Sequence, residues 1–99
     1  MSAAKKSALS DDQVQLIAKA LGDPRRYEIL KQLGDHEKAL ACGSVRECMD
    51  ISPATLSHHM RELKIAGLVK EVRNGKFVSY LLQRDILEAF FDRLRTDLI

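Results

Sequence analysis

The residue types most capable of chemistry lie in one short stretch, "ATLSHHMREL", which runs from Ala54 to Leu63. His58 and His59 are adjacent in it, and imidazole is both a metal ligand and an acid–base group near neutral pH. Adjacent helical residues point about 100° apart, whereas a helical metal site uses residues four apart. Ser57 and His58 diverge in the same way, so they form no nucleophile–base pair. Since the chain also has no glycine-rich phosphate loop, the sequence predicts no enzyme, no bound metal and no cofactor.

The two cysteines, Cys42 and Cys48, are the other reactive groups. Three interpretations stay open: buried small hydrophobic residues, a redox pair that senses oxidants, or a metalloid site that a partner chain completes, in principle with His36. The start of the chain lacks the apolar core of a secretory signal, and no apolar run reaches the ~18 residues of a membrane span. We therefore expect a cytoplasmic protein with reduced thiols and no membrane partner.

Helix signals precede and include the histidine stretch. Ser10 with Gln13 is a capping-box pattern, and Asp23-Pro24 and Ser52-Pro53 each place a capping acceptor before a proline at the first helical position. These patterns predict helices that end near Gly22, Gly34 and Gly67, which suits glycine as a helix terminator. Ser44 with Glu47 predicts a short helix over 45–49, after a short strand near 39–42. A short helix, a tight turn and a helix over 53–66 make a helix-turn-helix.

The segment "LVKEVRNGKFVSYLL" then predicts a β-hairpin, because Asn-Gly between two β-prone runs favours a type I′ turn. With Asn74-Gly75 as the loop, Arg73 lies opposite Lys76, Val72 opposite Phe77 and Val69 opposite Tyr80. An amphipathic helix over 85–98 closes the chain. The predicted fold is mostly α with a two-stranded β-hairpin wing, a winged helix-turn-helix over 10–99 after a disordered lead over 1–9.

The predicted helix over 53–66 has two different faces. Leu56, Met60 and Leu63 share the side that must meet the core, and His59 lies near its edge. The opposite side is small, polar and weakly basic, which suits a helix in the major groove of DNA. An ordinary solvated helix face is the alternative interpretation.

Charge distribution favours DNA. Residues 53–76 contain five basic and two acidic residues, a net charge of +3 where the whole chain has +2. Like charges opposite each other at the hairpin tip are destabilising, and an anion would relieve that repulsion. The sequence predicts contacts to double-stranded DNA from Ser52, Ala54, Thr55, Ser57, His58, Arg61, Arg73, Asn74 and Lys76. A winged-helix module that binds only protein is the alternative.

The segments "ALGDPRRYEILKQL" and "SPATLSHHMRELKIAGLVKEVRNGKFVSYLL", with the closing amphipathic helix, resemble the ArsR/SmtB family of bacterial transcriptional repressors. Met60 stands where that family usually has Leu. The resemblance implies a homodimeric repressor of an inverted-repeat operator, released from DNA by an inducer, with His59 supporting the helix. The thiolate run typical of metal-sensing members is absent, since Cys42 and Cys48 are six residues apart, and the last helix has no His.

Apolar faces on the first and last helices predict a homodimer interface, because large exposed apolar patches usually mark interfaces. The family also pairs these two helices across a two-fold axis. The predicted interface residues are Val14, Ile17, Leu21, Leu87, Phe90, Phe91, Leu94 and Leu98. The alternative is that the last helix packs wholly on its own domain.

Overall fold

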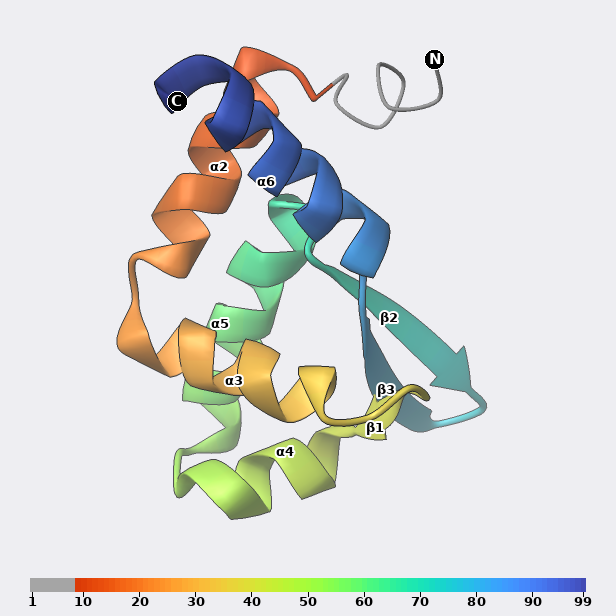
Figure 1. The fold of residues 1–99 in the computed structure, drawn as a ribbon. Coiled ribbons are helices and arrows are strands. Elements are labelled where there is room, and N and C mark those ends of the chain that lie inside the picture. Colours follow the sequence, from red (N-terminus) through yellow and green to blue (C-terminus); the bar gives the residue numbers. More distant parts are fainter. Residues whose placement is uncertain (1–8) are drawn as a thin grey trace.

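The computed structural model describes residues 9–99, which form five helices and one three-stranded sheet (Figure 1). The elements in chain order are α2 (Asp11–Leu21), α3 (Pro24–Gly34), β1 (Leu40–Ala41), α4 (Cys42–Met49), α5 (Pro53–Ile65), β2 (Val69–Asn74), β3 (Phe77–Leu82) and α6 (Arg84–Leu98). The prediction of a mostly helical fold with a hairpin wing is confirmed.

The sequence prediction of a disordered lead over 1–9 falls outside the described residues except at its last position. Leu9 is half-buried and packs against the core, and its carbonyl accepts a hydrogen bond from Arg93 of α6 at 2.7 Å. Leu9 therefore packs with the domain that the sequence predicts to begin at residue 10.

Three helices begin where the capping residues predict. Ser10 accepts from the Gln13 amide at 3.1 Å, Asp23 accepts from the Arg25 amide at 2.8 Å, and Ser52 accepts from the Thr55 amide at 3.1 Å. These side chains satisfy amide donors that have no partner within the helix. The side chain of Gln13 does not complete the predicted capping box but donates to the Ala66 carbonyl at the end of α5.

The start of α4 differs from its prediction. This helix begins at Cys42, directly after strand β1, and its cap at Ala41 makes no side-chain hydrogen bond. The Ser44 capping box is therefore wrong, because pairing of β1 with β3 positions the backbone that enters the helix. At the other end, Asp50 adopts a left-handed conformation (φ 51°) that turns the chain sharply towards α5. α4, this turn and α5 form the predicted helix-turn-helix.

The hairpin forms, but its register is shifted by two residues from the prediction. Asn74 pairs with Phe77 and Arg73 pairs with Val78, so the two-residue loop is Gly75-Lys76. Gly75 has a φ of +64°, while Lys76 has no positive φ. Positive φ at the first loop position only is the pattern of a type II′ turn, which takes glycine there. β1 adds a third strand next to β3, giving the order β1-β3-β2.

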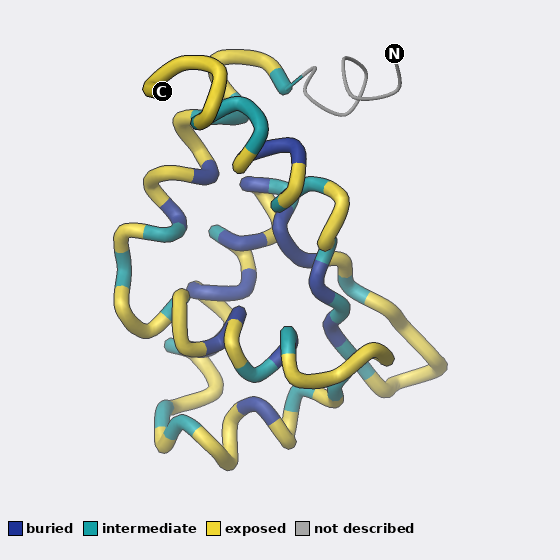
Figure 2. Tube along the Cα trace, in the orientation of Figure 1, coloured by how far each residue is buried: buried dark blue, intermediate teal, exposed yellow. Residues whose placement is uncertain are grey.

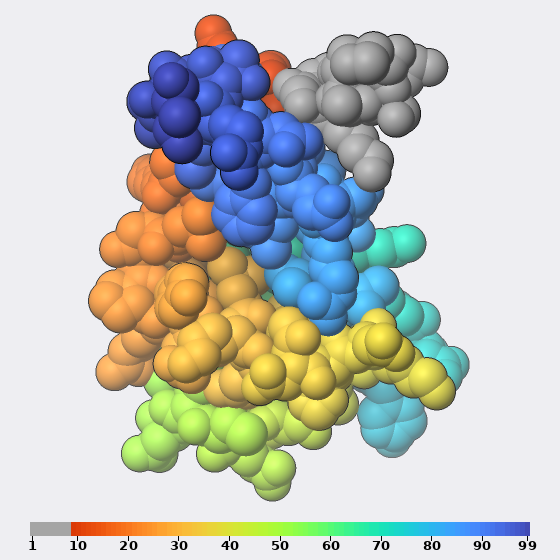
Figure 3. Space-filling view, viewed as in Figure 1, coloured from red at the N-terminus to blue at the C-terminus, as the bar shows by residue number. Residues whose placement is uncertain are grey.

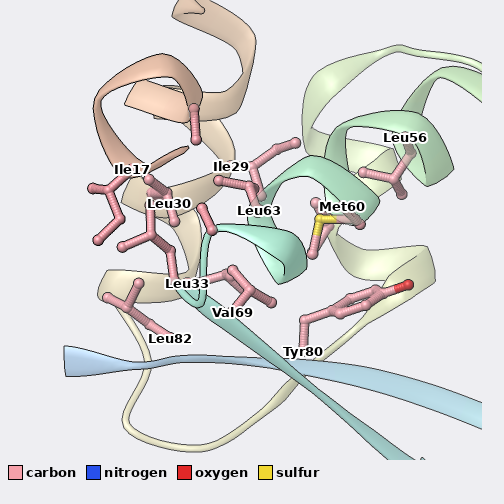
Figure 4. Close-up of a cluster of buried hydrophobic side chains, with 14 of the residues drawn as sticks. Ile17, Ile29, Leu30, Leu33, Leu56, Met60, Leu63, Val69, Tyr80 and Leu82 are labelled. Carbon is pink, nitrogen blue, oxygen red and sulfur yellow. The ribbon is translucent and has the colours of Figure 1, made fainter. Parts of the chain in front are cut away.

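Buried side chains from α2, α3, α5 and the base of the hairpin form one core, while the hairpin tip is exposed (Figure 2). Figure 4 shows these side chains facing one another between the helices and the strands. Leu56, Met60 and Leu63 are each at most 1% exposed, which confirms the predicted inner face of α5. The core thereby fixes the rotation of α5 about its own axis.

Arginine side chains tie the helix ends together. Arg26 donates to the Ala20 carbonyl at 2.9 Å, and Arg84 donates to the His36 carbonyl at 2.9 Å. Both bonds satisfy carbonyls at or just after the ends of helices, where backbone acceptors lack partners. Among residues 9–99, no helix is both long and apolar enough to span a membrane.

Candidate nucleic-acid interface

The outer face of α5 is polar and accessible. Ser52, Ala54, Ser57, His58 and Arg61 are exposed, and Thr55 is half-buried. Ser52 donates its hydroxyl proton to the Thr55 hydroxyl at 2.9 Å, which orders the first turn of the helix. The structure thus brings six of the predicted DNA-contacting residues onto one surface, with small side chains near the helix start that let another molecule approach the backbone closely.

His59 points the other way from His58. Its side chain is buried (6% exposed), and its Nδ1 has no hydrogen-bond partner among the described residues. Burial lowers the pKa of His59 below its ordinary value, against the opposing attraction of the nearby Asp23 carboxylate. The ring centroids of the two histidines are 5.9 Å apart and tilted by 54°, so the pair is not arranged to share a ligand.

The wing presents Arg73, Asn74 and Lys76, all exposed. The shifted register overturns the predicted repulsion of Arg73 and Lys76 across the turn, because Arg73 lies opposite Val78 instead. Lys76 sits above the ring of Phe77 with its ammonium 5.9 Å from the ring centroid, a cation–π geometry. The positive charge at the tip is therefore present, but its arrangement differs from the predicted one.

A hollow of about 350 Å³ lies between the exposed polar side of α5 and the wing. Ser57, Arg61 and Lys64 line it from α5, and Glu71 and Arg73 line it from β2. The Glu71 carboxylate forms ion pairs with Lys64 at 2.7 Å and with Arg73 at 2.6 Å. Sequence reasoning missed this pairing, since only the three-dimensional contact of α5 with β2 brings Lys64 and Glu71 together.

The cysteines do not form a ligand set. Cys42 is half-buried at the start of α4 and also lines the hollow, while Cys48 is exposed near the end of the same helix. Six helical residues span about 9 Å, beyond the ~7 Å Cα separation that a disulfide tolerates. A disulfide between Cys42 and Cys48 of one chain therefore requires α4 to unwind. Within residues 9–99, no group of three or more His, Cys, Asp or Glu side chains is placed to hold a metal.

The predicted interface residues on α2 and α6 divide into two groups. Ile17 is fully buried and Phe90 is only 4% exposed within one chain, so these two side chains pack into the core of their own chain. Phe91 (57% exposed) and Leu98 (75% exposed) are accessible, and Val14, Leu21, Leu87 and Leu94 are half-buried. α6 lies along the outer surface beside α2 in the space-filling view (Figure 3). The two helices thus leave an accessible apolar surface.

Comparisons with known proteins agree with this geometry. A family model described as "Helix-turn-helix domain" matches residues 21–72. The transcriptional repressor SdpR of Bacillus subtilis is 33% identical, over 73% of this chain and 78% of its own. The arsenical resistance operon repressor of Staphylococcus xylosus is 34% identical, over 81% and 75%. A homodimeric winged helix-turn-helix DNA-binding domain from Mycobacterium bovis, a possible ArsR-family regulator, matches with a TM-score of 0.71 at 28% identity, covering 91% of this chain and 89% of that one.

A helix-turn-helix with an exposed polar second helix, followed by a hairpin with a basic tip, defines a winged helix-turn-helix transcriptional regulator. The family match covers α3, α4, α5 and most of β2, and thus includes the whole helix-turn-helix and the exposed polar side of α5. The chain belongs to the ArsR family of transcriptional regulators.

Proposed function

We propose that this regulator is a homodimeric repressor that binds an inverted-repeat operator in double-stranded DNA. α5 lies in the major groove, where Ala54, Thr55, Ser57, His58 and Arg61 meet base edges, and Ser52 and the wing residues Arg73, Asn74 and Lys76 meet the backbone. The observation that carries the proposal is the division of α5 into a buried apolar side and an exposed polar side next to a basic wing. The repressor names of two relatives support repression as the outcome.

Groove and wing residues have different expected effects on binding. Lys76 contacts phosphate, so Lys76→Ala should weaken binding to every duplex and reduce the slope of log affinity against log salt by about 0.9 per lost contact. His58→Ala should instead change which base pairs are preferred and leave that slope unchanged. Both are measured by fluorescence anisotropy with a labelled duplex over a range of salt concentrations.

If both variants lose binding uniformly, the assigned roles of helix and wing are wrong. If the parent protein binds no duplex even at low salt, the chain acts through protein partners and the proposed function fails. Salt dependence separates the two classes, because phosphate contacts release counter-ions and most protein interfaces do not.

The dimer is proposed to form through α2 and α6. Phe91 and Leu98 are exposed apolar side chains on α6, and Phe91 also lines an apolar hollow together with Leu21 and Leu87, as expected of an interface. A two-fold axis there would hold two α5 helices about one DNA turn (~34 Å) apart. Phe91→Glu should convert the dimer to a monomer in light scattering, while Thr96→Glu, an exposed control on α6, should not.

The thiols support a narrower, second proposal for the inducer. Cys42 lines the same hollow as Ser57, Arg61 and Arg73, so oxidation of its thiol, or a metalloid bound there with a partner's ligands, would disturb the DNA-facing surface. Cys42→Ser protein should then stay on DNA when an oxidant or arsenite releases the parent. Equal release of the two proteins would exclude Cys42, and the same comparison with Cys48→Ser tests the exposed thiol.

A further inference from the structure

Glu71 is an acidic residue of β2 that lines the hollow next to the proposed DNA surface. Its side chain is 17% exposed, and its two carboxylate oxygens engage different cations, Oε1 with the Lys64 ammonium at 2.7 Å and Oε2 with the Arg73 guanidinium at 2.6 Å. The hydrogen bond from Lys64 is the main cause that lowers the pKa of Glu71, so the carboxylate stays ionised near neutral pH. One carboxylate thus holds a cation of α5 and a cation of the wing.

These ion pairs lie on the surface that is proposed to contact DNA and not in the interior of the protein. Lys64, Glu71 and Arg73 line the same hollow as Ser57 and Arg61, two of the residues assigned to the groove. Lys64 and Arg73 remain accessible, with 40% and 67% of their side chains exposed. A phosphate that enters the hollow therefore meets two cations that already share an anion.

We propose that Glu71 is an internal counter-ion that competes with DNA phosphates for Lys64 and Arg73, and thereby lowers the affinity for any duplex. The inference rests on the proposed function, because it needs a protein that binds DNA through α5 and the wing. Phosphate contacts carry no direct sequence information. The competition therefore reduces affinity for operator and random duplexes by the same factor and leaves the preference between them to the groove residues.

The chain offers a matched control in Glu62, the other acidic residue of the segment 53–76. Glu62 is half-buried on α5, forms no ion pair among the described residues, and does not line the hollow. Glu71→Gln and Glu62→Gln each remove one negative charge from nearly the same part of the molecule. Only Glu71→Gln releases two cations, so a difference between the variants measures competition and not overall charge.

The test is a salt titration of anisotropy with a random-sequence duplex and an operator duplex. Glu71→Gln should bind both duplexes roughly three- to tenfold more tightly than the parent, because each of the two exposed ion pairs that compete with DNA changes the binding constant by about a few-fold. The slope of log affinity against log salt should steepen by about 0.9 for each released cation. Glu62→Gln should keep the parent's slope and change affinity less than Glu71→Gln. In protein that also carries Lys64→Met and Arg73→Met, Glu71→Gln should lose its advantage.

Equal behaviour of Glu71→Gln and Glu62→Gln would overturn the inference while leaving DNA binding itself established. Weaker binding by Glu71→Gln would also overturn it, because Glu71 would then order the two cations for DNA. Absence of binding by the parent would instead refute the proposed function. If Glu71→Gln unfolds at a lower temperature than the parent, Arg73→Met and Lys76→Met give a second test. Arg73→Met should reduce DNA affinity less than Lys76→Met does, because Arg73 is paired with Glu71 and Lys76 pairs with no carboxylate among the described residues. Equal costs would contradict competition.

Discussion

Ser52 allows the stability of α5 to be separated from its contact with DNA. Two helices of this chain begin in the same way, with a capping acceptor followed by proline: Asp23-Pro24 opens α3, and Ser52-Pro53 opens α5. Aspartate and serine are about equally good caps. Only the start of α5 is assigned to the DNA surface, where a carboxylate would repel phosphate. We therefore predict that Ser52→Asp keeps the fold and loses DNA affinity, whereas Ser52→Ala loses stability.

The stability effect follows from the hydrogen bonds at the cap. Ser52→Ala removes the bond that the Thr55 amide donates to the Ser52 hydroxyl and the bond between the two hydroxyls. Loss of such a cap costs about 1 kcal/mol of unfolding free energy, or a fall of about 4–8 °C in Tm for a domain of this size. An aspartate at position 52 can accept hydrogen bonds from amides of the first turn, as Asp23 does from the Arg25 and Arg26 amides in α3, so Ser52→Asp should melt within ~2 °C of the parent.

The binding effect follows from Coulomb's law. A carboxylate about 6 Å from a phosphate, with an effective dielectric constant between ~20 and ~80, is repelled by about 0.7–2.8 kcal/mol. In a dimer the penalty applies at both half-sites, so the operator affinity should fall by at least roughly tenfold. Thermal melting by circular dichroism and anisotropy with an operator duplex measure the two effects on the same samples. A stable Ser52→Asp protein that binds DNA as tightly as the parent would refute the placement of the α5 start against the backbone.

Three further predictions concern the support of α5. Burial holds the pKa of His59 below its ordinary 6.5, so as the pH falls the unfolded chain binds that proton before the folded chain does. The contribution of His59 to the unfolding free energy should therefore be constant above about pH 7 and fall as the pH drops below 6.5. In urea titrations, His59→Gln should flatten this fall, whereas His58→Gln, at the exposed neighbour, should not. Gly67→Ala should destabilise the fold by more than about 1 kcal/mol, because Gly67 has a φ of +83° and an added Cβ would lie 2.6 Å from the Gln13 side chain; an unchanged Tm would contradict that strain. Leu63→Ala should cost about 2–5 kcal/mol, since Leu63 is fully buried in the core, and a loss under 1 kcal/mol would mean that α5 is not anchored there.

The sequence predicted those features that depend on local chemistry. The caps before Pro24 and Pro53 fix two helix starts, and the spacing of Leu56, Met60 and Leu63 sets which side of α5 is buried. These signals act within one or two helical turns, so they are visible without tertiary contacts. Knowledge of the buried side was enough to predict the exposed polar side of α5.

The hairpin register was missed for a physical reason. A shift of two residues returns every side chain to the same face of the strand, so the alternation of polar and apolar residues cannot distinguish the two registers. Asn74-Gly75 and Gly75-Lys76 are both acceptable loops, one with positive φ at both positions and the other only at glycine. The structure has the second loop, which separates Arg73 from Lys76 and leaves Arg73 to pair with Glu71.

Which side chains of α2 and α6 are buried within one chain could not be predicted from hydrophobic periodicity. A helical wheel places Ile17 and Phe90 on the apolar faces of their helices, but it does not show whether such a face packs on the core of its own chain or on a partner chain. Both are buried in one chain, and Phe91, the next residue, is exposed. The pairing of Lys64 with Glu71 was invisible for a related reason, because it depends on how α5 packs against β2.

Selection of bound duplexes from a random DNA pool by the reduced protein, at near-physiological salt, tests the central claim most directly. The account predicts enrichment of an inverted repeat with half-site centres about one helical turn, ~10 base pairs, apart. Enrichment of a single half-site would contradict the dimer through α2 and α6. No enrichment of any sequence would contradict base contact by the exposed face of α5.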